Sequence, residues 1–148
     1  MHSVQGGDLD QRDCELVILR VAVHMKAWYE WAAHVDRGLA AGLSLDDIYR
    51  VAEGPSSDGW NKRDASLLKS VDQLVENHRI EVETQTALGA YFSEKQVMDI
   101  VSLQGQYVTI ACIVGTWEIE LEDHIAERLP EAVTERSFRE LISAANRD

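Results

Sequence analysis

The sequence predicts an all-α fold, a single domain of about six to seven helices, and three observations support it. Apolar residues recur at helical spacing through most of the chain, strand-like alternation is not convincing anywhere, and turn residues separate the periodic segments. A chain of 148 residues can bury about 68–70% of its unfolded surface in one core. We therefore expect one domain over residues 1–148, with its core in residues 10–123.

The first two predicted helices come from the clearest apolar patterns. Within residues 10–24, the stretch 16–23 is apolar except for Arg20, which is typical of a central helix and leaves Glu15 and Arg20 in need of partners. A second helix spans residues 26–41 and stops at Gly42, a good residue for the left-handed position after a helix. Two adjacent helices near the start of the chain therefore form the expected centre of the fold.

Capping and turn residues mark the later helices. Ser44 and Ser93 each begin a capping-box sequence, so a short helix follows the first, and a long apolar helix running past Trp117 follows the second. Gly105 and Gly115 on the long helix suggest close packing against a neighbouring helix. The remaining predicted elements are a loop at 54–59, a helix from Asn61 or Asp64, a shorter helix over 81–91 and an amphipathic helix over 131–146.

Composition narrows the expected partners and compartment. The net charge of −12 disfavours nucleic acids and anionic membranes, which reward clustered Lys and Arg. No uninterrupted apolar run approaches the ~20 residues of a membrane span, and the first residues lack the apolar stretch of a leader. Cys14 and Cys112 lie far apart in apolar segments, which favours reduced thiols over a structural disulfide. We expect a cytoplasmic protein with a small-molecule substrate.

Residues 29–34, Tyr-Glu-Trp-Ala-Ala-His, give the strongest chemical signal. In a helix, Glu30 and His34 lie on one face with Cβ atoms about 5–6 Å apart, so the carboxylate can hold and polarise the imidazole. Glu15 is the third candidate, and Arg20 or His34 would pair with it if it is buried. The structural alternatives are an ordinary intrahelical pair for the first two and a favourable helix-dipole interaction for Glu15.

Aromatic residues near these groups are candidates for binding a substrate. Tyr29, Trp31 and Tyr107 have rings with a polar tip, which line small-molecule pockets but also fill protein cores. A metal site built from the three acid–base candidates is disfavoured, because the Glu-x-x-His spacing of carboxylate-bridged helical metal sites is missing. We therefore expect no metal and no cofactor.

The same segments resemble the carboxymuconolactone decarboxylase family, which shares an all-α fold with the AhpD-type alkylhydroperoxidases. The resemblance covers roughly residues 10–123 and implies Glu15, Glu30 and His34 as catalytic residues of a decarboxylase-like lyase or isomerase without a cofactor. A small carboxylated lactone or a related enolisable ring would be its substrate. The segments that carry the resemblance are residues 15–22, 29–34, 41–44, 60–74 and 92–107.

One departure separates this chain from the peroxidase branch. That branch carries a Cys-x-x-Cys-x-x-x-His motif, whose cysteines would fall on Ala27 and Glu30, although Glu15 and His34 align with its proton-relay residues. The thiolate is the nucleophile in peroxide reduction. Without cysteines at these two positions, the chain lacks the nucleophile that this reaction needs. An AhpD-like peroxide-detoxifying oxidoreductase stays an alternative, as does a non-catalytic oligomeric protein that binds a small molecule.

The resemblance also implies a homo-oligomer, either a trimer or a hexamer built from trimers. A physical reason points the same way. The helix that contains Glu15 and the helix over 93–117 together present more apolar surface than their short neighbours can easily cover.

Overall fold

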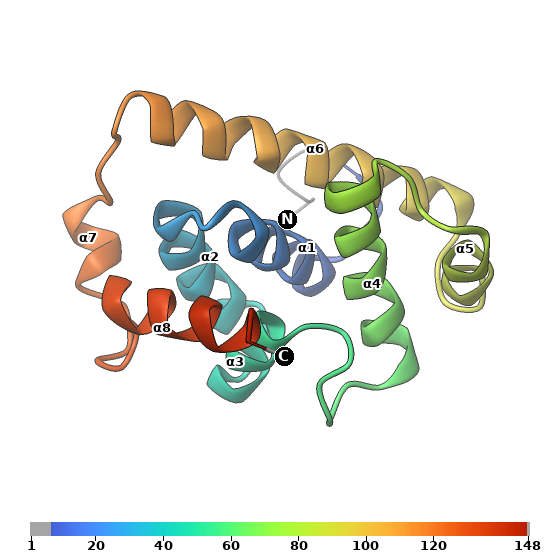
Figure 1. Ribbon diagram of the computed structural model, residues 1–148, viewed down its shortest axis with the longest axis horizontal. Coiled ribbons are helices and arrows are strands. Elements are labelled where there is room, and N and C mark those ends of the chain that lie inside the picture. Colours follow the sequence, from blue (N-terminus) through green and yellow to red (C-terminus); the bar gives the residue numbers. More distant parts are fainter. Residues whose placement is uncertain (1–6, 148) are drawn as a thin grey trace.

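The computed structural model describes residues 7–147, and in this part of the chain helices joined by turns and loops make up the fold, without strands (Figure 1). The all-α prediction is therefore confirmed, and the element that the sequence did not predict is the single turn α7. The predicted domain also included residues 1–6 and 148, which lie outside the described residues. The helices are α1 (Gln11–Met25), α2 (Trp28–Ala40), α3 (Leu45–Glu53), α4 (Lys62–Asn77), α5 (Val82–Gly89), α6 (Glu94–Thr116), α7 (Asp123–Ala126) and α8 (Glu135–Ala145).

Helix α1 is central, as its apolar sequence predicts. It begins at Asp10, whose side chain accepts a hydrogen bond from the backbone N–H of Asp13, and it ends at Lys26 with φ of 53°. Residues 13–19 and 21–23 are buried, because α2, α3, α4 and α6 all pack against this helix (Figure 1). Burial on every side removes Glu15 from solvent and makes its partner a structural requirement.

Local capping residues set the helix boundaries. At Ser44 and Ser93 both predicted capping boxes are present, with the serine hydroxyl and the third helical side chain each accepting a backbone hydrogen bond. A third box at Thr134 begins α8. Helix α2 ends at Ala40, and Gly42 takes the left-handed φ of 103°. The α2 end was thus predictable from one glycine.

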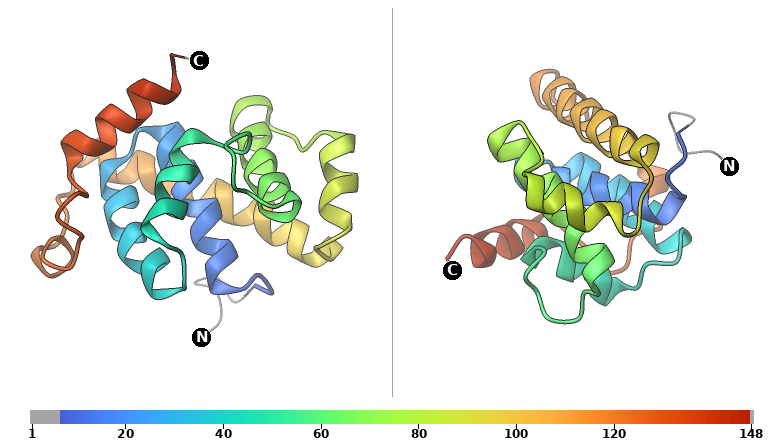
Figure 2. Two further views of the ribbon diagram at one scale, coloured as in Figure 1. Left: turned by 90° about the horizontal axis from the view of Figure 1, so that it is seen from below. Right: turned by 90° about the vertical axis from the view of Figure 1, so that its right-hand side faces the viewer.

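The last helix lies within the stretch 131–146, where the sequence predicts an amphipathic helix. Its Phe138 ring is fully buried and stacks on Trp31 with ring centroids 5.1 Å apart. The same ring meets Trp28 at 6.1 Å, and α8 packs against α3 as well (Figure 2). These contacts fix α8 to α2, which carries the candidate site.

Helix α6 is mostly exposed although its sequence is apolar. It ends at Thr116, one residue before Trp117, rather than running beyond it as predicted. Within residues 7–147 it is the one helix long and apolar enough to cross a membrane by length and composition, with a window of mean hydropathy 1.5 that is 17% buried. The expectation of a protein without a membrane partner stays a prediction.

The glycines of α6 do not pack as the sequence suggests. A Cβ added at Gly105 or Gly115 would meet no heavy atom within 4 Å, so neither glycine allows a close helix contact inside this chain. The expectation of close packing is therefore wrong within the single chain. The exposed large apolar side chains on α6 and just after it are Met98, Val101, Ile113, Trp117 and Ile119.

Candidate active site

A buried carboxylate–imidazole pair joins α1 to α2. The Nδ1 atom of His34 lies 2.6 Å from Oε2 of Glu15, and these residues are 4% and 0% exposed. The Gln11 amide donates to the other oxygen of Glu15 at 2.6 Å. An ionised Glu15 carboxylate accepts a hydrogen bond from Nδ1–H, which leaves Nε2 as the ring nitrogen available for chemistry.

The structure corrects the predicted partner of His34. Glu30 lies one turn before His34 on α2, but both of its carboxyl oxygens are buried and without a hydrogen-bond partner. The imidazole is held instead by Glu15, because α1 packs directly against α2 and brings this carboxylate to Nδ1. The predicted intrahelical pair therefore does not form.

Burial sets the protonation of Glu30. The residue is 3% exposed, and this loss of solvation raises the pKa of its carboxyl group, while the polarity of its own backbone N–H and the charge of His34 act in the opposite direction. An unpaired carboxyl group in such surroundings favours its neutral form, which carries a proton. Glu30 can therefore act as an acid beside the Glu15–His34 pair.

A cavity of about 350 Å³ lies against His34. The ring of Tyr107 on α6 meets the His34 ring edge-on, with centroids 5.1 Å apart and planes at 88°. Tyr29 closes part of the wall, and its hydroxyl donates to Glu122 at 2.6 Å. This hydrogen bond, together with burial, raises the pKa of Tyr29 to about 12, so the phenol stays protonated.

Two of the three predicted aromatic residues border this cavity. Tyr29 and Tyr107 line it together with Glu30 and His34. Trp31 does not, because its side chain points into the core and is 1% exposed against Phe138. Its predicted role in substrate binding is therefore replaced by a role in packing.

Sequence reasoning missed several residues of the cavity wall. Arg37 lies three positions after His34, and its charge partly offsets the effect of burial, which raises the pKa of Tyr107. Helical spacing from His34 could have identified it. Glu122 and His124 also line the cavity, but they come from the segment after α6, and no local pattern connects them with α2.

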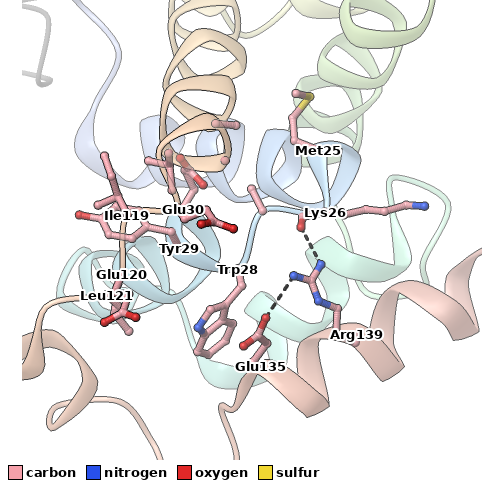
Figure 3. A pocket seen from close by; sticks show the side chains of 15 residues that line it. Met25, Lys26, Trp28, Tyr29, Glu30, Ile119, Glu120, Leu121, Glu135 and Arg139 are labelled. Carbon is pink, nitrogen blue, oxygen red and sulfur yellow. Dashed lines mark hydrogen bonds and ion pairs between the residues drawn. The ribbon is translucent and has the colours of Figure 1, made fainter.

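A second, larger cavity of about 860 Å³ adjoins the first, and both are lined by Tyr29 and Glu30 (Figure 3). Its walls are the turn between α1 and α2, the last turns of α6, the segment 118–121 and the first residues of α8. Glu30 is thus a wall residue of two cavities, and only the smaller one contains His34.

The two cysteines lie away from the positions that peroxide reduction would use. Both are free, and Cys14 is buried whereas Cys112 is exposed. Burial, reinforced by the neighbouring Glu15 and Asp13, raises the pKa of the Cys14 thiol to about 12, so this sulfur is not a thiolate near neutral pH. Among residues 7–147, no three His, Cys, Asp or Glu side chains are placed to bind one metal ion.

Comparison with known families matches the part of the chain that carries the acid–base residues. Residues 1–72 match the carboxymuconolactone decarboxylase family. The match covers α1 and α2, and therefore Glu15, Glu30 and His34. Comparison with curated proteins gave no match.

A solved structure shares the fold. It is that of a protein of unknown function from Agrobacterium tumefaciens, described as a proposed antioxidant defence protein AhpD. The sequences are 22% identical, the match covers 80% of this chain and 83% of the other, and the TM-score is 0.73. This likeness places the helical arrangement among AhpD-like folds.

Proposed function

We propose that this chain, whose residues 1–72 match the carboxymuconolactone decarboxylase family and whose fold resembles that of an AhpD-like protein, is a cofactor-independent lyase or isomerase. Its substrate would be a small carboxylated lactone or a related enolisable ring compound. The observation that carries the proposal is the Glu15–His34 hydrogen bond at the wall of a cavity that also borders the unpaired carboxyl group of Glu30.

The chemistry requires two functions that these residues can supply. When a carboxylate next to a conjugated carbonyl leaves as CO₂, the electron pair of the broken C–C bond moves into the ring and forms a dienolate. The enzyme must stabilise the developing oxyanion, and it must then deliver a proton to carbon. One proton is consumed for each CO₂ released.

Each residue has a role that its surroundings favour. His34 is held by Glu15 through its Nδ1, and in its doubly protonated form the Nε2–H can donate to the oxyanion. Glu30, whose pKa is raised by burial, can give a proton to carbon when it is protonated. Arg37 at the cavity wall makes no ion pair among the described residues and can attract the substrate carboxylate. The roles of His34 and the carboxyl groups could be exchanged.

The same groups would serve related reactions. Dehydration, lactone isomerisation and pericyclic ring closure each need an acid, a base or an oxyanion donor near one ring. The residues therefore define the location of the site but are compatible with more than one type of reaction.

A peroxide-reducing antioxidant function is the second candidate, because the solved structure with the same fold is described as a proposed antioxidant defence protein AhpD. Against it, Ala27 and Glu30 occupy the positions of the two redox cysteines, and Cys14 is a buried thiol of high pKa. A third candidate is a non-catalytic protein that binds a small molecule in the same cavity.

The test is a panel of carboxylated lactones and carboxylated enols, assayed with the unmodified protein and with Glu30→Gln and His34→Gln. We expect turnover of at least one compound by the unmodified protein and loss of that turnover in both variants. Binding without turnover would favour the non-catalytic protein. Peroxide reduction that requires Cys14 or Cys112 would favour the antioxidant function instead.

A further inference from the structure

The larger cavity has walls that suit an organic cation. It is bordered by three glutamates without an ion-pair partner among residues 7–147, namely Glu30, Glu118 and Glu120. Two cationic residues, Lys26 and Arg139, lie at its edge. The Lys26 side chain extends away from Glu30, and Arg139 already has partners (Figure 3). Arg139 donates to the backbone oxygen of Lys26 at 2.7 Å and pairs with Glu135 at 3.3 Å (Figure 3).

Glu30 distinguishes this cavity from an ordinary acidic surface. Glu118 and Glu120 are exposed and solvated, but Glu30 is 3% exposed, and neither of its oxygens has a hydrogen-bond partner. Its side chain lines the cavity beside Tyr29 and Trp28 (Figure 3). A buried polar group without a partner costs free energy, and a ligand that donates hydrogen bonds would remove this cost.

The rest of the wall is suited to an apolar group. Trp28 and Tyr29 offer aromatic surface near the carboxyl group, and aromatic faces attract cations as well as apolar ligands. Val114, Ile119 and Leu121 line the cavity from α6 and the segment that follows. A volume of about 860 Å³ holds a ligand much larger than a water molecule.

From these contacts we infer that the larger cavity binds a primary amine with an apolar body, whose ammonium group donates hydrogen bonds to Glu30. The inference does not depend on the reaction proposed for the smaller cavity. The two are nevertheless linked through one side chain. An ammonium group at Glu30 would hold the carboxylate in its ionised form and so withdraw the acid from the neighbouring cavity.

The probe is 2-phenylethylamine, titrated into the protein by calorimetry, with 2-phenylethanol as the neutral compound of the same shape. We expect saturable binding of the amine, and binding of the alcohol that is about tenfold weaker or more, since a charged hydrogen bond is lost. Glu30→Gln should weaken the amine to the level of the alcohol. Glu76→Gln removes an exposed carboxylate on α4, outside both cavities, and should leave the amine affinity unchanged.

A second variant keeps the test decisive if Glu30→Gln folds poorly. Gly115 lines the cavity, and a Cβ there meets no heavy atom within 4 Å, so the side chain that Gly115→Leu adds begins in open space at the cavity wall. This variant should weaken both probes. The inference is overturned if the amine does not bind saturably, if the alcohol binds equally well, or if either variant keeps the amine affinity of the unmodified protein.

Discussion

The contact between α1 and α4 and the site between α1 and α2 bury carboxylates in opposite ways. At the α1–α4 contact, Asp13 and Asp64 are both buried, and each is held by an arginine. Arg12 donates to Asp64 at 2.7 Å, and Arg63 donates to Asp13 at 2.8 Å. Every buried charge in this contact is therefore neutralised within the chain.

The α1–α2 site is incomplete by the same measure. Glu15 has two partners, but Glu30, equally buried, has none. Completed pairs hold a fold together, whereas a buried polar group left unpaired lowers stability and is typical of a functional site. The difference teaches that charge alone does not mark the site in this acidic chain. The missing partner does.

The largest expected effect is on activity. Glu30→Gln and His34→Gln should each lower turnover of the true substrate by about 10²–10⁴-fold, because each removes a proton donor. The melting temperature should move little in Glu30→Gln, since no hydrogen bond is lost. The double variant should be little worse than either single one. Near-normal turnover in both single variants would contradict a catalytic role for Glu30 and His34.

Substituting a paired buried carboxylate should lower stability more than the Glu30 substitution does. Asp72 accepts from Arg20 and from His24, each at 2.6 Å, and all three side chains are at least four-fifths buried. Asp72→Asn leaves Arg20 without its counter-charge and should lower the free energy of unfolding by about 3 kcal/mol, measured by urea denaturation.

The control for this loss is an exposed ion pair. Asp36→Asn removes the partner of Arg128, whose side chain is 55% exposed, and should cost only about 0–1 kcal/mol. Equal effects of the two substitutions would show that burial does not separate these pairs.

The two kinds of carboxylate should also depend on pH with opposite signs. Although burial alone would raise the pKa of Asp72, hydrogen bonds from His24 and Arg20 hold it below its ordinary value. Its stabilisation is full above the unfolded pKa of about 3.9 and is lost as pH falls through the folded pKa. The pKa of Glu30 is raised by burial, so its contribution is full below about pH 4.3 and is lost as pH rises through the folded pKa.

Unfolding curves measured across this pH range would check both signs. The stability of the unmodified protein minus that of Asp72→Asn should decrease as the pH is lowered. The stability of the unmodified protein minus that of Glu30→Gln should decrease as the pH is raised toward neutral. A Glu30 difference that rises with pH would mean that this carboxylate has gained a partner in solution.

The exposed apolar face of α6 should be covered by other copies of the chain. We propose a homo-oligomer, a trimer or a hexamer, because α6 presents exposed apolar side chains including Met98 and Ile113. Light scattering at micromolar concentration should show no major monomer. Ile113→Lys should shift the mass downward, and a clean monomer in the unmodified protein would contradict the proposal.

The smallest expected effect is that of the cysteines. Changing Cys14 or Cys112 to Ala should leave the proposed turnover unchanged, because neither sulfur lines the smaller cavity. Thiol-dependent peroxide reduction, followed in a coupled assay with a thioredoxin-type donor, should be negligible. Activity that disappears with one of these substitutions would favour the antioxidant function.

Much of the fold was predictable because its signals are local. The capping boxes at Ser44 and Ser93 depend on side chains three residues apart, and Gly42 marks the end of α2 by its own conformational freedom. The exposure of α6 was not predictable in this way. Its apolar sequence is compatible with burial in the chain, in a partner or in a membrane, and only tertiary packing distinguishes these.

The candidate site was predictable in its residues but not in its contacts. Helical spacing placed Glu30 beside His34, yet the closer partner is Glu15, 19 positions away in sequence. No single-helix pattern contains that contact, because it depends on how α1 and α2 cross. The position of Glu122 opposite Tyr29 depends in turn on where the segment after α6 returns.

The difference in exposure between the two thiols allows the local opening of α1 to be measured by alkylation. Cys14 adjoins Glu15 in the buried N-terminal part of α1, while Cys112 is exposed on α6. Where no other copy of the chain covers α6, an alkylating reagent would modify Cys112 at once, which calibrates the reagent within the same molecule. Modification of Cys14 would then proceed only as fast as α1 becomes uncovered, so its rate measures how often the helix that anchors His34 opens.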